Sequence, residues 1–287
     1  MKKIKNFSSI CSQINLPLKQ IKIIENSLNF KKGSIFLVGG AVRNLVLRKK
    51  FENQYPDLVT DLSINDLILC LKRSNIKTLP IGIKFGSVLA IIDKIKIDVT
   101  IMREDLNTDG RWATVKHTKD VERDAMRRDF TMNSIYCDTK GNLYDPNNGY
   151  NHLKKGIVKF IGDIDKRVKE DFLRILRFVR FSINYDKCLN HDTLKKLVKH
   201  EKNISKLSHE RRFEELEKII VHKNFSKNVN VKVIKQIIQS AIGSKLNFNN
   251  FERLCQIEEK LKNISFSRRL KFLLRDNKNS FIFERKI

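Results

Sequence analysis

Two aspartates, Asp57 and Asp98, each lie in a short segment whose sequence is typical of a β-strand. In residues 95–102 apolar and polar side chains alternate, so Asp98 points away from the apolar face of its strand. Carboxylates on neighbouring strands can hold Mg²⁺, which takes oxygen ligands and also binds substrate phosphates. The two aspartates are therefore candidate ligands of a catalytic Mg²⁺ ion.

A glycine pair provides a second functional feature. The apolar run 34–38 leads into Gly39-Gly40 and then into a helix-like stretch that carries Arg43. Glycine lets the backbone approach a ligand closely, and the free N–H groups at a helix start favour anions, so we expect a phosphate site here. The segment lacks the GK[ST] ending of a P-loop and the three-glycine dinucleotide fingerprint, so neither of those sites is indicated.

Two later segments combine arginine with acidic or amide side chains. The segment RRDFTMN supplies Arg127, Arg128, Asp129 and Asn133. The segment EDFLRILRFVRF has helical spacing, and Asp171 and Arg174 within it are three residues apart, so we expect both on one face of a helix. Together, the two carboxylates, the glycine turn and these arginines indicate metal-assisted transfer at a nucleotide phosphate.

The elements that position these residues follow from the hydrophobic pattern. Residues 1–32 have the apolar spacing of a helical lead-in, and residues 86–93 and 95–102 predict a hairpin with a short turn. The polar stretch 103–125 predicts an irregular, mobile loop. Most of the chain beyond about residue 155 is predicted to be helical, and no internal repeat is present.

Composition restricts the partners. The 287 residues include 58 Lys and Arg against 32 Asp and Glu, which gives a net charge of +26 and favours a polyanion such as RNA. The five cysteines are widely spaced with no CxxC pair, so we expect reduced thiols. No run approaches the ~20 apolar residues of a membrane span, and no signal peptide is evident, so we expect a cytoplasmic protein without membrane contact.

The order of the motifs resembles that of one known family. GGAVRNLVL, a DLVT segment, IDVTIMRED, RRDFTMNSIYCD, EDFLRILRFVRF and LSHERRFEELEKII follow the succession in class II tRNA nucleotidyltransferases, a family that includes the bacterial poly(A) polymerases. The resemblance extends from about residue 34 to 220. It implies an α+β fold, with a polymerase β-like nucleotidyltransferase head built on a mixed sheet, followed by an all-α neck and a shortened body.

The resemblance also implies domain limits and residue roles. The lead-in would cover residues 1–32, the head 33–150, the helical neck 151–212 and a short body with a reduced tail 213–287. Asp57 and Asp98 would be catalytic and would bind Mg²⁺. The nucleotide, ATP or CTP, would be bound by Gly39, Gly40, Arg43, Arg127, Arg128, Asp129, Asn133, Asp171, Arg174 and Arg177. Among these, Asp171 and Arg174 would read the base edge, and the segment containing Glu210, Arg211 and Arg212 would brace their helix.

The sequence departs from the family pattern at the first metal motif. On the better alignment Asp57 is the second aspartate of that motif and Tyr55 replaces the first, while Asn44 stands where the family usually has Asp. A second register would use Asp61 and Ser63, and it fits the downstream spacing less well. Glu52 and Asp61 are candidates for a substitute carboxylate.

The expected function is addition of CMP and AMP to the 3′ end of tRNA, which builds or repairs CCA. Poly(A) addition with ATP alone shares the same motifs, and the sequence does not separate the two. A third alternative is a degenerate member that binds tRNA or nucleotides without polymerising, which the Tyr55 replacement favours. The sequence does not indicate an oligomeric state.

Overall fold

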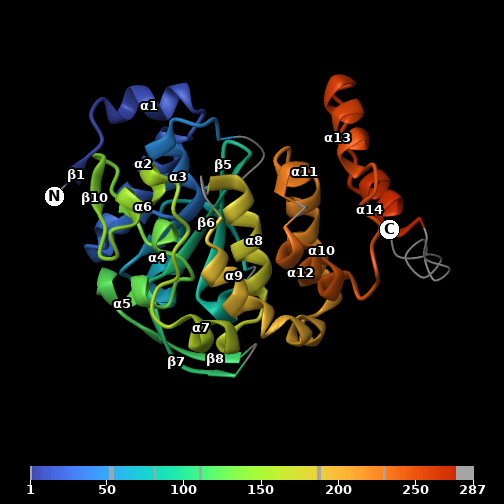
Figure 1. The fold of residues 1–287 in the computed structure, drawn as a ribbon. Coiled ribbons are helices and arrows are strands. Elements are labelled where there is room, and N and C mark those ends of the chain that lie inside the picture. Colours follow the sequence, from blue (N-terminus) through green and yellow to red (C-terminus); the bar gives the residue numbers. More distant parts are fainter. Residues whose placement is uncertain are drawn as a thin grey trace. The chain divides into compact units, whose positions relative to one another are not determined.

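The computed structural model describes residues 2–51, 55–80, 82–109, 112–185, 189–228 and 231–275. The chain divides into two compact units (Figure 1). The first comprises Met1–Lys155 with Lys159–Gly162, and the second comprises Gly156–Val158 with Asp163–Ile287.

The first unit is built on a mixed sheet of eight strands. Their spatial order is β1 (Lys2–Lys3), β10 (Asn142–Tyr144), β9 (Tyr136–Cys137), β2 (Ile35–Leu37), β3 (Asp57–Thr60), β6 (Ile95–Ile101), β5 (Ser87–Ile92) and β4 (Lys77–Leu79). Neighbouring strands are antiparallel except β3 and β6, which are parallel. The α+β class with a mixed sheet is therefore confirmed.

The central strands are fixed by the alternation in their sequence. On β6 the residues Ile97, Val99 and Ile101 are buried, whereas Asp98 is only partly buried on the other face. The predicted hairpin is present, because β5 and β6 pair in register across Asp93 and Lys94, both with positive φ. Two successive residues with φ > 0 match the twist of a tight hairpin.

Nine helical segments of the first unit accompany this sheet within its described residues. Seven of them are α1 (Phe7–Gln13), α2 (Leu18–Leu28), α3 (Gly39–Leu47), α4 (Ile64–Arg73), α5 (Val121–Met126), α6 (Gly149–Lys155) and the short 3₁₀ turn η3 (Thr131–Asn133). Two other 3₁₀ turns, η1 (Asn29–Lys31) and η2 (Ile83–Phe85), complete the set. Beside the sheet, Val38, Val59, Met102, Ala125 and Tyr136 form one buried cluster.

The expectation of an irregular loop over residues 103–125 is wrong. Residues Arg103–Asp109 (β7) and Trp112–His117 (β8) form a separate two-stranded antiparallel ribbon, and α5 follows it. The ribbon contains a register shift between Asp105 and Asn107, which interrupts the regular alternation of a strand. Without that alternation, the polar sequence gave no period-2 signal.

All regular elements among the described residues of the second unit are helices. It contains α7 (Ile164–Glu170), α8 (Leu173–Tyr185), α9 (His191–Val198), the 3₁₀ segment η4 (Glu201–Lys206), α10 (His209–Ile220), α11 (Phe225–Asn228), α12 (Lys232–Ile242), α13 (Phe251–Lys260) and α14 (Phe266–Leu274). These helices agree with the all-α region predicted after the sheet. In Figure 1 they extend from yellow-green α7 to red α14.

Buried charged side chains connect the later helices. Arg269 of α14 is fully buried, and its Nε lies 2.6 Å from Glu258 Oε2 of α13. The same guanidinium donates to the carbonyl of Ile220 at the end of α10, at 2.6 Å. Because removing one partner of a buried ion pair leaves an uncompensated charge, this contact fixes the packing of three helices.

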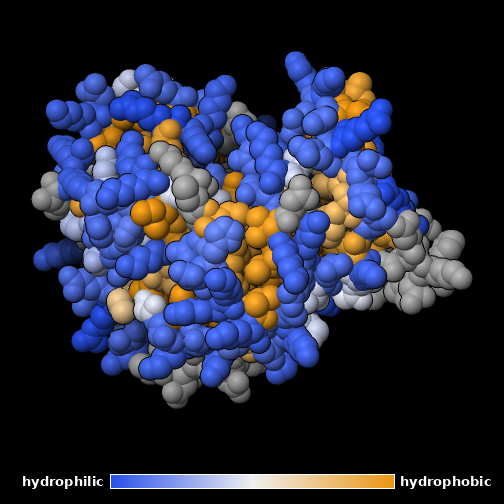
Figure 2. Space-filling view, in the orientation of Figure 1, coloured by the Kyte–Doolittle hydropathy of each residue, from blue (hydrophilic) through white to orange (hydrophobic). Residues whose placement is uncertain are grey.

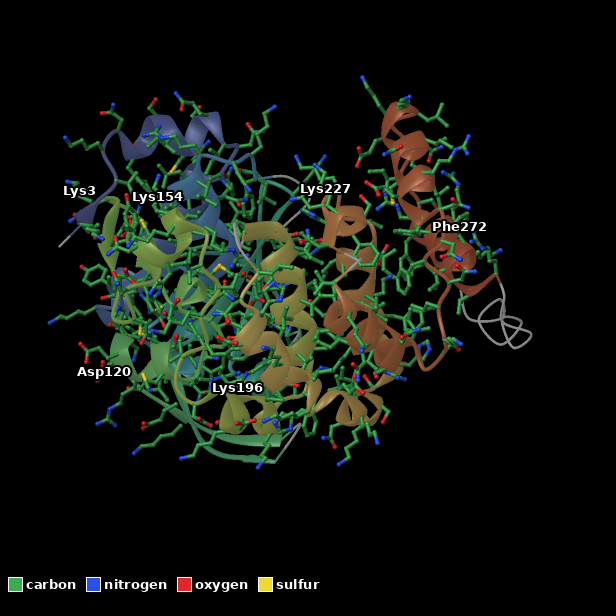
Figure 3. All side chains as sticks on the ribbon, viewed as in Figure 1. Lys3, Asp120, Lys154, Lys196, Lys227 and Phe272 are labelled. Atoms are coloured by element: carbon green, nitrogen blue, oxygen red, sulfur yellow. The ribbon has the colours of Figure 1, made fainter. Side chains whose placement is uncertain are left out.

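Polar side chains cover most of the surface visible in Figure 2, as expected for a chain of net charge +26. Lysines occur on both units, and Figure 3 labels Lys3 and Lys154 on the first unit and Lys196 and Lys227 on the second. Among the described residues, no helix is long and apolar enough to cross a membrane. Four of the cysteines, Cys11, Cys70, Cys137 and Cys255, are buried free thiols, as predicted; Cys188 lies outside the described residues.

Candidate active site

Asp57 and Asp98 are direct partners in the parallel pairing of β3 with β6. Residues opposite each other on paired strands point to the same face of a sheet, and paired strands lie roughly 4.8 Å apart. The pairing is held at this point by the amide of Asp98, which donates to the carbonyl of Pro56 at 3.1 Å. The structure thus brings together two carboxylates that are 41 residues apart in the sequence.

The glycine turn lies against this carboxylate pair. Gly39 has φ +58, and a Cβ placed on it would come within 3.2 Å of Asp57 Oδ2. The amide of Val38 donates to the carbonyl of Asp57 at 3.0 Å, which ties the turn to β3. A side chain at position 39 would therefore be strained by its φ value and would press against the carboxylate.

Helix α3 begins directly after this turn, at Gly39, and the preceding residue Val38 makes no side-chain cap. The first N–H groups of a helix have no partner inside the helix, and without a capping side chain they are available to an anion. The start of α3, where an anion could bind, therefore lies beside Asp57.

The orientation of Asp98 is set by a neighbour that the sequence analysis missed. Ser87 Oγ at the start of β5 donates to Asp98 Oδ1, and Thr100 Oγ1 lies 3.4 Å from Ser87 Oγ. Ser87 is paired with Thr100 in the β5–β6 register, and this places it diagonally next to Asp98 on the same face. The predicted hairpin could have revealed this contact, because pairing residues outward from its turn places Ser87 diagonally next to Asp98.

The replaced position of the metal motif carries an exposed tyrosine. Tyr55 is 54% exposed, and Lys96 Nζ lies 5.5 Å from the centroid of its ring. Asp61 follows the other end of β3, four residues from Asp57 and roughly 13 Å along the strand, and its Oδ1 accepts from Ser34 N at 2.7 Å. Glu52 lies outside the described residues.

The second register for the metal motif does not suit the observed contacts. Ser63 is the N-cap of α4, where its Oγ accepts from the amide of Asp66 at 3.2 Å and donates to Asp66 Oδ2 at 2.9 Å. Both Asp61 and Ser63 thus have structural partners away from the carboxylate pair. Among the described residues, no group of three or more His, Cys, Asp or Glu side chains gathers as a metal site.

Arg43 connects the glycine turn to the RRDFTMN segment. Its Nη1 donates to Asn133 Oδ1, and Asn133 Nδ2 donates to Asp129 Oδ1 at 2.8 Å. Asp129 Oδ1 also accepts from the amide of Phe130 at 2.8 Å. Three predicted nucleotide-binding residues therefore form one hydrogen-bonded chain from α3 to η3, in which each side chain orients the next.

Arg127 and Arg128 share one buried carboxylate, which was not predicted. Asp124 of α5 is fully buried, and its two oxygens accept from Arg127 Nε at 2.8 Å and Arg128 Nη2 at 3.0 Å. Tyr136 Oη donates to Asp124 Oδ2 at 2.6 Å, and Arg128 Nε donates to Tyr136 Oη at 2.9 Å. The two arginines are thereby held in fixed orientations.

The charges of this network shift its ionisation. Burial acts to raise the pKa of Asp124, but the positive charges of Arg128 and Arg127 outweigh it and lower the pKa to about 2. Burial raises the pKa of Tyr136, so this hydroxyl stays protonated and can donate to Asp124. Asp124 is therefore a structural anion at neutral pH, buried beneath the arginine pair.

In the second unit, the expectation that Asp171 shares a helix face with Arg174 is wrong. Helix α7 ends at Glu170, Asp171 has extended backbone angles, and α8 begins only at Leu173. Asp171 Oδ1 accepts from the amide of Leu173 at 3.1 Å, as an aspartate at a helix start commonly does. The helix breaks here because an Asp side chain accepts hydrogen bonds from the free N–H groups at a helix start, and Asp is less favourable inside a helix.

The side chain of Asp171 is also fixed by a neighbouring helix. Arg211 of α10 donates from Nη2 to Asp171 Oδ2 at 2.8 Å, and both side chains are partly exposed. This contact comes from the LSHERRFEE segment that was expected to brace the nucleotide-reading helix. The structure thus brings these two elements together as the sequence indicated.

Arg174 has a different set of partners. Its Nη1 lies 2.5 Å from Glu170 Oε2 and donates to the carbonyl of Arg167 at 2.7 Å. Glu170 also accepts from Arg167 Nη1 at 2.5 Å, and its role was not foreseen. Glu170 and Arg174 are four residues apart across the junction of α7 and α8, a spacing that is a recognisable signal for ion pairing.

Arg177 lies one turn further along α8. Its Nη1 is 3.9 Å from Glu215 Oε1 of α10, and its guanidinium lies 5.4 Å from the centroid of the Phe181 ring. Arg180 Nε lies 3.0 Å from the other oxygen of Glu215, which is buried. These contacts link α8 to α10 beside the Asp171–Arg211 pair.

Sequence comparison relates both units to known proteins. Residues 35–159 match the family described as Poly A polymerase head domain, and residues 188–231 match the one described as Probable RNA and SrmB-binding site of polymerase A. The human mitochondrial CCA tRNA nucleotidyltransferase 1 is 37% identical over 189 residues, which are 64% of this chain and 43% of that protein. Residues 35–159 thus belong to the Poly A polymerase head domain family.

Other members of the family support this assignment. The CCA-adding enzyme of Oceanobacillus iheyensis is 34% identical over 196 residues, 68% of this chain and 48% of that protein. Among solved structures, the Bacillus stearothermophilus CCA-adding enzyme in complex with CTP matches with a TM-score of 0.67 at 25% identity, over 90% of this chain and 65% of that one. The chain spans about half the length of the family members whose sequences it matches.

A second solved structure shows the shared fold. The Thermotoga maritima CCA-adding enzyme complexed with tRNA matches with a TM-score of 0.73 at 21% identity, over 99% of this chain and 69% of that one. The shared fold thus covers both the sheet unit and the helical unit. The activities of these relatives belong to proteins longer than the present chain.

Proposed function

We propose that this protein is a template-independent RNA nucleotidyltransferase that adds CMP and AMP to the 3′ end of tRNA. The observation that carries the proposal is the pairing of Asp57 with Asp98 beside the start of α3. In the reaction, the RNA 3′-hydroxyl attacks the α-phosphate of CTP or ATP. The new phosphodiester bond forms as the bond to pyrophosphate breaks, and pyrophosphate leaves.

Asp57 and Asp98 would hold Mg²⁺. Two carboxylates on one face of the sheet, next to a site for phosphate, suit an ion that binds to one or two carboxylates together with substrate phosphates. When bound, Mg²⁺ would neutralise phosphate charge and favour loss of the proton from the attacking hydroxyl. Ser87 would keep Asp98 oriented toward this position through its hydrogen bond to Oδ1.

The residues of the glycine turn would bind the triphosphate. The N–H groups at the start of α3 face a position beside Asp57, and Arg43 lies one helical turn later. The chain of contacts from Arg43 through Asn133 to Asp129 would position the ribose and phosphates. Arg127 and Arg128, anchored by Asp124, would add positive charge on a fixed support.

Asp171 and Arg174 would select the base. A carboxylate offers hydrogen-bond acceptors and a guanidinium offers donors, so the pair can match the Watson–Crick edge of a nucleobase in place of a template. Selection of this kind requires that both groups be held still. Arg211 holds Asp171, and Glu170 with the carbonyl of Arg167 holds Arg174.

The proposed RNA substrate agrees with the charge of the chain. A net charge of +26 attracts a polyanion and makes binding sensitive to salt. The matched relatives are named as CCA-adding enzymes and CCA tRNA nucleotidyltransferases, and this favours tRNA over other RNAs.

The direct test is incubation with tRNA that lacks its CCA end, together with Mg²⁺ and labelled CTP or ATP. Ordered incorporation of two C and one A is the expected result, whereas a long A tract would indicate poly(A) addition. Tyr55 at the first metal position favours a second candidate, a tRNA-binding protein without transferase activity. Salt-sensitive tRNA binding with no incorporation would support that candidate and contradict the proposal.

A further inference from the structure

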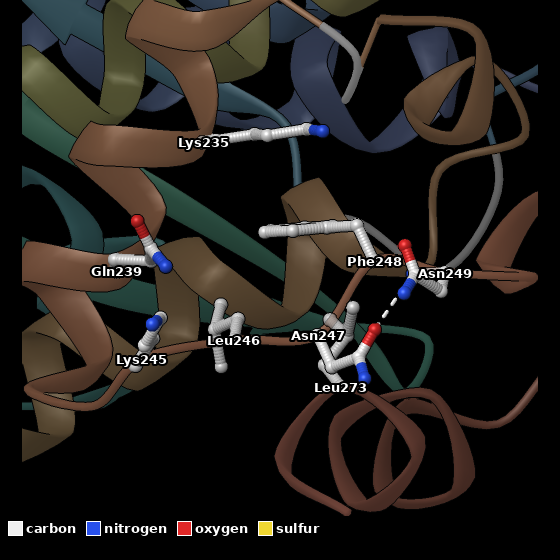
Figure 4. Close-up of a pocket in the computed structure, with 8 residues that line it drawn as sticks. All are labelled: Lys235, Gln239, Lys245, Leu246, Asn247, Phe248, Asn249 and Leu273. Atoms are coloured by element: carbon white, nitrogen blue, oxygen red, sulfur yellow. Dashed lines mark hydrogen bonds between the residues drawn. The ribbon is translucent and has the colours of Figure 1, made fainter. Parts of the chain in front are cut away.

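A polar pocket lies in the second unit. Neither Asp171 nor Arg174, the proposed nucleotide-reading pair, lies on the elements that form it. Its walls come from α12, from the loop between α12 and α13, and from the end of α14 (Figure 4). Its cavity is about 500 Å³, within the range of roughly 300–1,000 Å³ that is common for ligand pockets. It lies just beyond residues 188–231, which match the probable RNA-binding family.

The side chains that line the pocket fall into three chemical kinds. Lys235 and Lys245 are cationic, Phe248 is aromatic, and Gln239, Asn247 and Asn249 are amides. The described residues that line the pocket include no carboxylate. Lys235 and Gln239 are four residues apart on α12 and therefore lie on one face of that helix.

Phe248 and Lys235 approach each other across the pocket. Lys235 Nζ lies 5.2 Å from the centroid of the Phe248 ring, and the phenyl ring is only partly buried (Figure 4). A flat aromatic face next to a cation can receive a base by stacking and hold the adjoining phosphate at the same time. The amides supply donors and acceptors that can meet the edge of an unpaired base.

The loop that carries Phe248 is held in place by hydrogen bonds. The amide of Asn247 donates to the carbonyl of Leu273 at 2.8 Å, and the amide of Asn249 donates to Asn247 Oδ1 at 2.8 Å. Arg275 Nη2 donates to the carbonyl of Asn249 at 2.8 Å. These three contacts hold Asn247 and Asn249 on either side of Phe248 and keep the pocket preformed, which lowers the entropy that a ligand must lose on binding.

We propose that this pocket binds one unpaired nucleotide of the RNA substrate, with its base stacked on Phe248 and its phosphates near Lys235 and Lys245. This inference rests on the proposed function, because that function identifies the ligand as RNA. It adds a second contact on the RNA, in the helical unit, to the 3′ end that reacts.

Binding of a labelled single-stranded oligouridylate to the full chain, measured by fluorescence anisotropy over a range of salt, tests the proposal. We expect Phe248→Leu to weaken binding about 5- to 100-fold, as loss of a stacking platform does, and Phe248→Tyr to retain it. The double variant Lys235→Ala with Lys245→Ala should lower the slope of log affinity against log salt by about one to two. Lys232→Ala, an exposed lysine on the first turn of α12 outside the pocket, is the matched control and should bind like the wild type.

Three outcomes would overturn the proposal. These are unchanged affinity in Phe248→Leu, an unchanged salt slope in the lysine double variant, and a loss of affinity in Lys232→Ala as large as in the lysine double variant. Circular dichroism of each variant shows whether the fold is retained, and Phe248→Tyr gives an answer even if Phe248→Leu unfolds.

Incorporation of labelled CMP and AMP, measured on the same preparations, separates this inference from the proposed function. Pocket-dependent RNA binding without incorporation would retain the pocket and refute the transferase. If the protein incorporates CMP and AMP and the pocket variants bind RNA like the wild type, the transferase proposal is retained and the pocket proposal is refuted.

Discussion

Asp57 and Asp98 lie directly opposite each other on the only parallel pair of strands among the described residues of the sheet. Their side chains share a face because of the strand register. A shift of β3 by one residue would place Asp57 on the buried face, where Leu58 now lies. The hydrogen bond from Val38 N to Asp57 O ties the same strand to the start of α3. Carboxylates and phosphate-binding amides are thus positioned by one set of backbone contacts.

Tyr55 offers a gain-of-function test of the site. If Asp57 and Asp98 bind Mg²⁺ with one carboxylate fewer than the family pattern, Tyr55→Asp should restore a ligand. We expect the rate of CMP incorporation to rise roughly 10-fold and the Mg²⁺ concentration for half-maximal rate to fall, because ligand charge increases metal affinity. Tyr55→Asn is the control of similar size without the charge, and an equal gain in that variant would argue against a metal-binding role.

Arg174 is predicted to determine nucleotide choice. Arg174→Ala removes donors proposed to face the base edge, so discrimination between CTP and ATP should fall by roughly 10- to 100-fold, while tRNA affinity changes little. Single-nucleotide incorporation with each triphosphate measures the ratio. A large loss of tRNA binding with unchanged nucleotide selectivity would refute the assignment.

Arg211 is predicted to act through Asp171. Since its guanidinium holds Asp171 Oδ2 at 2.8 Å in a partly exposed pair, Arg211→Ala should reduce nucleotide selectivity by roughly 5-fold. Lys218→Ala on the same helix, whose ammonium makes only a 3.7 Å contact to Glu215, is the matched control. Equal selectivity in Arg211→Ala and the control would show that Asp171 does not depend on this ion pair.

Asp124 is predicted to support the first unit in a pH-dependent way. Its pKa is lowered from 3.8 to about 2, so its contribution is complete above about pH 4 and is lost as the pH falls through about 2. The contribution corresponds to about 2 kcal/mol, and Asp124→Asn, which leaves two arginines without their anion, should cost roughly 3 kcal/mol at pH 7.

Urea unfolding at pH 7 and pH 3 measures this effect. The difference in unfolding free energy between wild type and Asp124→Asn should shrink at the lower pH. Glu122→Gln, an exposed carboxylate on the same helix, should change stability by less than about 0.5 kcal/mol at either pH. An Asp124 variant that unfolds like Glu122→Gln would show that the arginine pair does not need its buried anion.

The parts of the fold with clear periodicity could be predicted from the sequence. Alternation along residues 95–101 placed Asp98 on the open face, and the apolar run before Gly39-Gly40 predicted the strand, turn and helix that form β2 and α3. The direct pairing of Asp57 with Asp98 joins distant segments, and the sequence supplied only their strand-like character.

The features that were missed depend on tertiary contacts. Asp124 occurs in a run of polar residues, and only its burial beneath Arg127 and Arg128 distinguishes it from its neighbours. The break between α7 and α8 at Asp171 was hidden because the apolar spacing continues through it, while the capping contact is local to one side chain. The ribbon at residues 103–117 pairs polar strands with an irregular register, so no period could reveal it.

The central claim is that Asp57 and Asp98 perform metal-assisted nucleotidyl transfer, and the most direct test is the single-turnover rate of CMP incorporation into tRNA lacking CCA. Asp57→Asn and Asp98→Asn should each slow this rate by about 100-fold or more, because several kcal/mol of charge stabilisation is lost, while tRNA affinity stays within about 2-fold. Asp93→Asn, at the turn of the same hairpin, should match the wild type. Wild-type incorporation by Asp98→Asn would contradict the account.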